Sequence, residues 1–124
     1  MFVKQLLNLF ITSYYKQRLV KLMSPLGKLL KWGTFAYEAF LAIPFIGGLF
    51  VVANAWVPLG IAFLLHVIAI VVLLKERGPV VGHGIGVVTS IVAVIPFVGW
   101  FMHAITAIVL LVEGVMSSRR SPRY

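Results

Sequence analysis

Four apolar stretches, separated by short breaks, dominate the chain after residue 33. They cover residues 34–55, 57–74, 80–95 and 98–116. A spanning helix needs roughly 20 predominantly apolar residues to cross a hydrocarbon core of about 30 Å, and each stretch is at or slightly below that length. Pro44 interrupts the first stretch and predicts a kink there. The pattern therefore predicts an all-α membrane protein with four transmembrane helices joined by tight turns.

The segment before these stretches, residues 1–33, is less apolar and follows a helical period. When residues 2–16 are placed at 100° per residue, the large apolar side chains fall on one side and the lysines on the other. A basic amphipathic helix of this kind is too polar to span the bilayer and suits the membrane interface. We therefore expect it to lie on the membrane surface.

A second, shorter interfacial helix is predicted over residues 26–32. Ser24 and Pro25 have the residue types of an N-cap and a first helical position. Within this helix, Lys28 and Lys31 are expected to face water.

Composition strengthens the membrane interpretation. Hydrophobic residues make up 61% of the sequence, and the mean hydropathy is +1.06. Soluble domains contain roughly 45–50% apolar residues. A small soluble domain buries only about 60–70% of the surface that its unfolded chain exposes, so lipid must cover the excess here. The sequence contains no cysteine, which excludes disulfides, a thiol nucleophile and a cysteine-ligated metal.

Charge predicts the topology. The chain has 11 basic and 3 acidic residues, for a net charge of +8. With a cytoplasmic amino terminus and four spans, all 11 basic residues fall on the cytoplasmic side, including those of the tail 117–124. The two outer turns, residues 54–56 and 95–97, carry no charge. Both termini are therefore expected in the cytoplasm, and the compact chain is typical of a prokaryotic plasma membrane protein.

Basic residues near the spans are expected to contact anionic lipid head groups. Those of the amino-terminal segment are Lys4, Lys16, Arg18, Lys21, Lys28 and Lys31. No nucleic-acid-binding motif accompanies the positive charge, so nucleic acid is not an expected partner.

An internal repeat joins the second and fourth stretches. The segments His66–Glu76 and His103–Glu113 both place histidine and glutamate ten residues apart, and six of their eleven positions are identical. Upstream, Gly48 and Gly86 each precede a proline by ten residues. The repeat predicts two similar helical hairpins related by an axis along the membrane normal, an arrangement known in some transporters.

His66 and His103 are the candidate functional pair. The helical rise of 1.5 Å per residue places them about 12 Å and 10 Å inward from the prolines that precede them, near the bilayer midplane. Ionisable groups at that depth are costly and mark proton or substrate pathways. A pair of histidines could also ligate haem. The plainer interpretation, which the sequence favours, is that each neutral ring hydrogen-bonds a polar group and joins helices.

The remaining polar and small residues give weaker signals. Glu38, Glu76 and Glu113 are expected at the cytoplasmic face, where they pair with basic residues or form a ring of carboxylates. A small-residue ridge for helix packing, inside the molecule or between copies, is formed by Gly82, Gly86 and Ser90. His83 lies in the expected cytoplasmic loop, where a lone histidine is usually solvated.

These features favour a non-enzymatic scaffold or accessory subunit that contacts other membrane proteins or further copies of itself. The alternatives are an oligomeric transporter or proton-coupled channel that uses His66 and His103, and a bis-histidine haem protein for electron transfer. No hydrolase, nucleotide-binding or zinc motif is present in the sequence, so we expect no enzyme, no metal and no cofactor.

Overall fold

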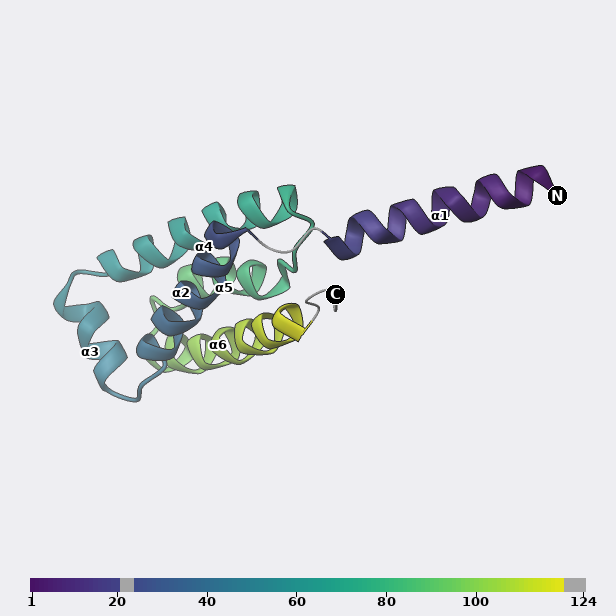
Figure 1. Ribbon diagram of the computed structural model, residues 1–124. Helices are drawn as coiled ribbons and strands as arrows, with labels where there is room; N and C mark the ends of the chain where they lie inside the picture. The colour runs from purple at the N-terminus through teal and green to yellow at the C-terminus, as the bar shows by residue number, and fades with distance from the viewer. Residues whose placement is uncertain (21–23, 120–124) are drawn as a thin grey trace.

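The computed structural model describes residues 1–20 and 24–119, and these residues form helices without any strand (Figure 1). The helices are α1 (Phe2–Val20), α2 (Pro25–Leu41), α3 (Ile46–Ala53), α4 (Val57–Lys75), α5 (Val81–Val92) and α6 (Pro96–Arg119). The predicted all-helical class is confirmed.

Helix α2 starts as the sequence predicts but continues further. Ser24 is its N-cap and accepts a hydrogen bond from the Gly27 backbone N–H at 3.1 Å, and Pro25 is the first helical residue. The sequence predicts a short interfacial helix over residues 26–32 and a separate span from residue 34. This separation is wrong, because α2 runs without interruption from Pro25 to Leu41. The buried stripe of the helix includes Lys31 and Thr34, so polar residues there face the interior.

The kink expected at Pro44 is confirmed, and it is a complete break. Helix α2 ends at Leu41, α3 begins at Ile46, and the two axes differ by 96°. Between them, the backbone of Phe45 is left-handed with a φ of 66°, and the Ile46 N–H donates to the Pro44 carbonyl at 2.8 Å. This i to i+2 hydrogen bond closes a γ-turn of three residues at the bend between the two helices.

Helices α2, α4, α5 and α6 pack around a common interior. Helix α2 contacts α4 and α6, and α5 contacts the same two helices from the other side (Figure 1). Contacts between distant segments show that neighbours run in opposite directions. Near its start α2 meets the end of α4 through Ser24 and Glu76, whereas past its end it meets the start of α6 through Ala42 and Trp100.

Helix α3 lies at one end of this packed group, which we call the α3 end. There α2 ends, α4 and α6 begin, and α3 contacts all three. A small apolar cluster holds it in place, formed by Leu41, Val51, Leu59 and Ala93 with Tyr37 beside them. The Tyr37 hydroxyl donates to the Pro58 carbonyl at 2.9 Å, which ties α2 to the start of α4.

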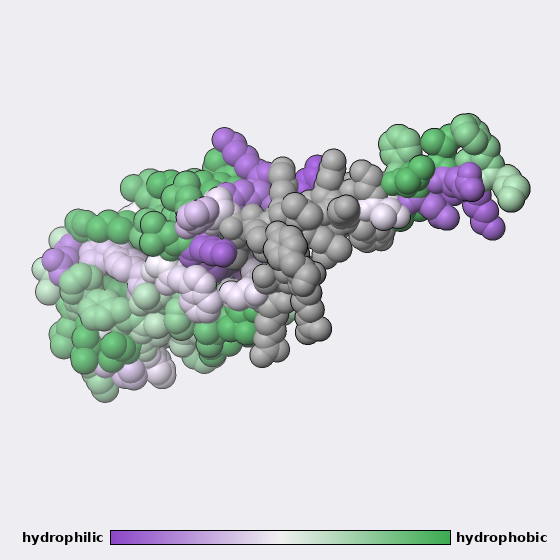
Figure 2. Space-filling view, in the orientation of Figure 1, coloured by the Kyte–Doolittle hydropathy of each residue, from purple (hydrophilic) through white to green (hydrophobic). Residues whose placement is uncertain are grey.

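The interior of the packed helices contains many polar residues beside its apolar ones, whereas the outer surface is largely apolar. The buried polar residues are Lys31, Thr34, Glu38, His66, His83, Thr89, Ser90, His103 and Thr106. Large hydrophobic side chains are exposed along the outer faces of the helices, as Figure 2 shows. Soluble domains have the opposite distribution, so a surface of this kind needs an apolar surrounding.

By length and composition, α4 and α6 could each cross a membrane, and α2 with α3 could form a third, bent span. Helix α5 is apolar but has only 12 residues. It is shorter than the expected stretch 80–95, because the chain turns after Val92. The predicted count of four spans and the two-hairpin symmetry stay predictions.

One part of the expected repeat has no structural counterpart. Gly48 and Gly86 are matched by their spacing, yet Gly48 lies in the short α3 and Gly86 lies in α5, inside the packed group. The reason is the additional helix α3, which occupies the connection between α2 and α4.

Helix α1 stands apart from the rest. It contacts none of the other described helices and extends away from them (Figure 1). The start of α1 shows the expected two-sided character, because Figure 2 shows hydrophobic atoms on one side of it and hydrophilic atoms on the other. Its apolar side chains, such as Phe2 and Phe10, are exposed, as is Lys4.

Candidate functional site

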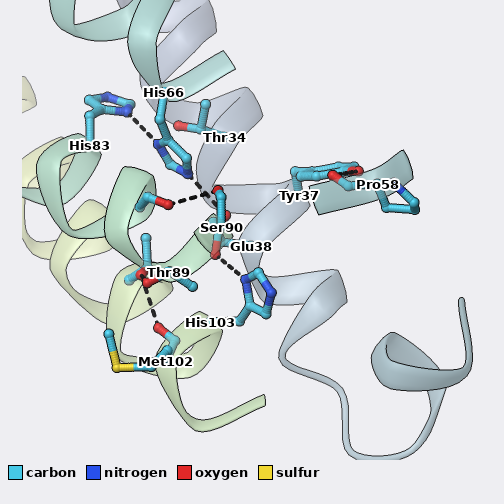
Figure 3. Close-up of polar contacts among 12 residues, drawn as sticks. Thr34, Tyr37, Glu38, Pro58, His66, His83, Thr89, Ser90, Met102 and His103 are labelled. Carbon is cyan, nitrogen blue, oxygen red and sulfur yellow. Dashed lines mark hydrogen bonds and ion pairs between the residues drawn. The ribbon is translucent and has the colours of Figure 1, made fainter. Parts of the chain in front are cut away.

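Glu38 of α2 lies at the centre of the buried polar group. Its carboxylate oxygens face two histidine rings from two other helices (Figure 3). The Nε2 atom of His66 lies 2.9 Å from Oε1, and the Nδ1 atom of His103 lies 2.6 Å from Oε2. Glu38 and His66 are fully buried, and His103 is 3% exposed. A single carboxylate therefore joins His66 and His103, the candidate pair that the sequence predicts.

His83 of α5 extends this arrangement. Its Nδ1 atom lies 3.0 Å from the Nδ1 atom of His66, and its side chain is fully buried. The result is a linear sequence of contacts from His83 through His66 and Glu38 to His103, with one residue from each of the four packed helices (Figure 3). We call these four residues the histidine–glutamate network.

Helical periodicity and small neighbours explain how the network forms. In α4, His66 belongs to the buried stripe and has Ala62 and Ala69 one turn away on either side. In α5, Gly86 faces the same ring. A Cβ atom on Gly86 would overlap the His66 ring, so the absence of a side chain at this position makes room for the imidazole.

The geometry fixes which atoms carry protons when Glu38 is ionised. Both rings next to Glu38 then donate N–H, so a neutral His66 is protonated at Nε2 and accepts at Nδ1. His83 must donate from its own Nδ1 to satisfy that acceptor. The Nε2 atoms of His83 and His103 are then both free acceptors, and neither has a partner among the described residues.

A second arrangement uses the same heavy-atom contacts and holds one more proton. If Glu38 is protonated at Oε1, it donates to His66 Nε2, His66 donates from Nδ1 to His83, and His83 carries its proton at Nε2. The two arrangements differ by one proton at the His83 end and by the direction of two hydrogen bonds. The network can therefore take up or release a proton while every internal hydrogen bond is kept.

The network extends along the helix axes. His83 is the third residue of α5, so it lies about 3 Å along the axis from the start of that helix. His103 is the eighth residue of α6, about 10 Å from the α3 end, where α6 begins. Because α5 starts at the opposite end, His83 and His103 lie near different ends of the packed group.

A buried ion pair lies near the His83 end. The Nζ atom of Lys31 donates to Glu113 at 2.6 Å and to the Pro79 carbonyl at 2.9 Å. Glu113 also accepts from the Gly82 backbone N–H at 3.0 Å, in the first turn of α5. A carboxylate is favoured at a helix amino terminus, where unpaired N–H groups and the positive end of the helix dipole meet.

Several expectations for individual residues are wrong. Lys31 does not face water, because its side chain is fully buried in the ion pair with Glu113. His83 is not solvated, because α5 carries it into the interior. Glu38 does not lie with the other two acids. Glu76 instead accepts hydrogen bonds from the backbone and hydroxyl of Ser24, so the three carboxylates form three separate contacts.

The small-residue ridge of α5 packs within the molecule. Gly86 faces His66 of α4, and a Cβ atom on Gly82 would meet Leu110 and Glu113 of α6. The Ser90 hydroxyl donates to the Gly86 carbonyl at 2.8 Å. His83 lies three residues before Gly86 and seven before Ser90, on the same helical face. This spacing is the signal that would have placed His83 in the interior.

The structure describes the surroundings of only some of the lysines and arginines that are expected to contact lipid head groups. Lys4 and Lys28 are exposed. Lys16 and Arg18 belong to α1, and Lys21 lies outside the described residues. None of the residues described by the structure forms a group of three or more side chains arranged to hold a metal ion.

No protein-family model, curated protein or solved structure matches the chain.

Proposed function

We propose that the protein is a small multi-pass membrane protein that conducts protons through the histidine–glutamate network. The observation that supports this function is the buried linear contact from His83 to His103 through Glu38. Chains of histidines and carboxylates inside membrane helices are typical of proton pathways. Both nitrogens of His66 have partners, so this ring connects His83 to Glu38 without a gap.

Burial of an acid between two histidines also has an energetic consequence. An isolated carboxylate in an apolar interior is costly, and exchange of a proton with a neighbouring imidazole relieves that cost. The two proton arrangements described above have the same internal hydrogen bonds, so neither leaves Glu38 unsatisfied. This supports a role in which Glu38 is the central proton carrier.

The membrane arrangement that we propose has four spans, formed by α2, α4, α5 and α6, in a prokaryotic plasma membrane with both termini in the cytoplasm. The alternating directions of these helices and the basic residues before α2 support it. In this orientation, the His83 end faces the cytoplasm and the α3 end faces outward. Helix α1 then lies on the cytoplasmic leaflet, with its lysines against anionic head groups.

The direct test is proton flux into liposomes that contain the purified protein and a trapped pH-sensitive dye. Glu38→Gln keeps the size of the side chain and its hydrogen-bonding capacity but cannot carry a proton, so flux should fall to the level of empty liposomes. The matched control is Thr106→Val, which removes a buried hydroxyl one turn from His103 and should leave flux unchanged. Equal flux from wild type and Glu38→Gln would contradict proton conduction by the network.

A second candidate is an accessory, non-enzymatic subunit of a larger membrane complex. The observation that favours it is α1, whose large apolar side chains from Phe2 to Ile11 are exposed and which contacts none of the other described helices. A helix of this kind has a surface available for a partner protein as well as for lipid. Gentle extraction followed by identification of every chain in the native peak would test it, and a peak of this chain alone would contradict it.

Haem ligation receives no support from the geometry. The ring nitrogens of His66 contact His83 and Glu38, and one nitrogen of His103 contacts Glu38. Axial ligation by this pair would require the network to break.

A further inference from the structure

A small cavity at the α3 end is lined in part by His103. It has a volume of about 20 Å³, and its walls come from α2, α3, α6, the turn between α5 and α6, and Trp56 before α4. The residues that matter for the argument are Leu41, Gly48, Val51, Trp56, Trp100 and His103. A single water molecule needs roughly 10–15 Å³ of such space, so the cavity has room for one water and little more.

His103 gives this cavity a chemical character. Its side chain is 97% buried, since only 3% is exposed, and its Nδ1 side is occupied by Glu38. The Nε2 atom has no partner among the described residues, and Figure 3 shows this second nitrogen turned away from Glu38. A buried imidazole nitrogen without a hydrogen bond is costly, and a water in the cavity would satisfy it.

The walls of the cavity are built by the bend between α2 and α3. The 96° change of direction folds α3 back across the end of the packed helices, so that Gly48 and Val51 line the cavity. Residues on both sides of α3 hold left-handed conformations, with φ values of 66° at Phe45 and 60° at Trp56. The Trp100 indole N–H donates to the Ala42 carbonyl and fixes the start of α6 to the end of α2.

We infer that this cavity is a binding site for one water molecule or hydronium ion, which loads the histidine–glutamate network with a proton through His103. The loading role rests on the proposed proton conduction, whereas the binding of water at His103 stands independently of it. The ligand is of water size and donates a hydrogen bond, because the cavity is small and the unpartnered Nε2 atom of His103 is an acceptor when Glu38 is ionised.

The loading step balances in atoms and charge. One O–H bond of hydronium breaks and an N–H bond forms at His103 Nε2, which leaves water in the cavity. His103 then passes its Nδ1 proton to Glu38 Oε2, so the ring becomes neutral again and the carboxylate is neutralised. The network now holds four protons, as many as the second arrangement described above. It reaches that arrangement when the Glu38 proton moves from Oε2 to Oε1 and each of the three rings moves its proton to its other nitrogen, which returns His103 to Nδ1–H and places a proton on His83 Nε2. Release of that proton, with a shift along the two reversed hydrogen bonds, restores the first arrangement.

Solid-state NMR of the full-length protein in liposomes, labelled with 15N-histidine, tests the binding site directly. In water-to-protein polarisation transfer, the His103 Nε2 signal should build up early, and the His66 signals should not. A His103 signal that builds up no faster than those of His66 would overturn the inference, whether or not the protein conducts protons.

Two glycine substitutions connect the cavity to function. Gly48 lines the cavity, and an added Cβ atom there meets no neighbour within 4 Å, so the side chain of Gly48→Leu has room beside the cavity and should cover its opening. Gly60→Leu is the matched control, because an added Cβ atom also meets no neighbour within 4 Å there and Gly60 lies outside the cavity. We expect Gly48→Leu to lose the His103 water signal and to reduce flux to the level of Glu38→Gln, while Gly60→Leu keeps both. Unchanged His66 and His83 signals establish that the variant is folded.

The outcomes separate the two proposals. If Gly48→Leu removes the water signal but leaves flux intact, the loading role is overturned and proton conduction stands. If wild-type protein conducts no protons, the proposed function fails, and the water signal at His103 alone decides the binding site.

Discussion

Replacement of Gly86 by alanine should displace the His66 ring and break the histidine–glutamate network. All three atoms nearest to an added Cβ atom at position 86 belong to that ring, and they are too close for the ring to stay in place. His66 is fully buried and has hydrogen-bonded contacts on both nitrogens, to Glu38 and to His83. Displacement of the ring therefore removes two buried hydrogen bonds at once.

The expected loss of stability follows from these two contacts. A buried polar group left without its partner costs about 1–3 kcal/mol, so the two bonds together account for about 2–6 kcal/mol. Alanine recovers about 1 kcal/mol through its higher helix propensity. We therefore expect Gly86→Ala to lower the free energy of unfolding by about 1–5 kcal/mol. If the His66 ring stays in place and α4 and α5 move apart instead, overpacking costs about 1–3 kcal/mol. This cost lies within the range expected for displacement of the ring.

The control is Gly84→Ala on the same helix, where an added Cβ atom meets no neighbour within 4 Å. This variant should be as stable as wild type or gain up to about 1 kcal/mol. Both free energies can be measured by equilibrium unfolding in mixed micelles with increasing SDS, followed by circular dichroism. Equal stability of Gly86→Ala and Gly84→Ala would refute the reasoning, because it would mean that His66 does not occupy the space at Gly86.

Three further predictions concern other parts of the molecule. Lys31→Met leaves Glu113 without its partner and should destabilise the protein by about 3–5 kcal/mol, whereas the double variant with Glu113→Gln should recover part of this loss in the same unfolding assay. Removal of residues 1–20 should weaken binding to anionic vesicles without preventing membrane insertion, since α1 contacts none of the other described helices; loss of insertion in a fractionation assay would contradict this. Because the sequence has no cysteine, single cysteines at Asn54 and Ser117 report topology, and an impermeant thiol reagent outside intact cells should label only the first.

Hydrophobic periodicity predicted the helices well where apolar runs are uninterrupted. The expected stretch 57–74 became α4 at Val57–Lys75, and Pro44 marked the break between α2 and α3. A proline, which lacks an N–H donor, and a run of apolar residues are local signals. Helices and helix breaks can therefore be predicted from them without knowledge of the tertiary fold. The capping of α2 by Ser24 was predictable for the same reason.

The polar residues of the interior were harder to place. Sequence reasoning assigned Lys31 and Glu38 to the membrane surface because each lies near the expected end of a span, yet both are fully buried. The partner of Lys31 is Glu113, which lies 82 residues away in the sequence. The partners of Glu38 are His66, 28 residues away, and His103, 65 residues away. Such pairs depend on helix packing, which periodicity along one helix does not determine. The histidine pair itself was found from its depth, but the carboxylate that joins it was not.

The state of the Glu38 carboxyl group tests the central claim most directly. Infrared difference spectra recorded after a proton jump on protein in liposomes should show the band of a protonated carboxyl group appear. The band should be absent in Glu38→Gln and should persist in Glu76→Gln, whose carboxylate caps α2 outside the network. A band that persists in Glu38→Gln, or no band in the wild type, would contradict proton transfer through Glu38.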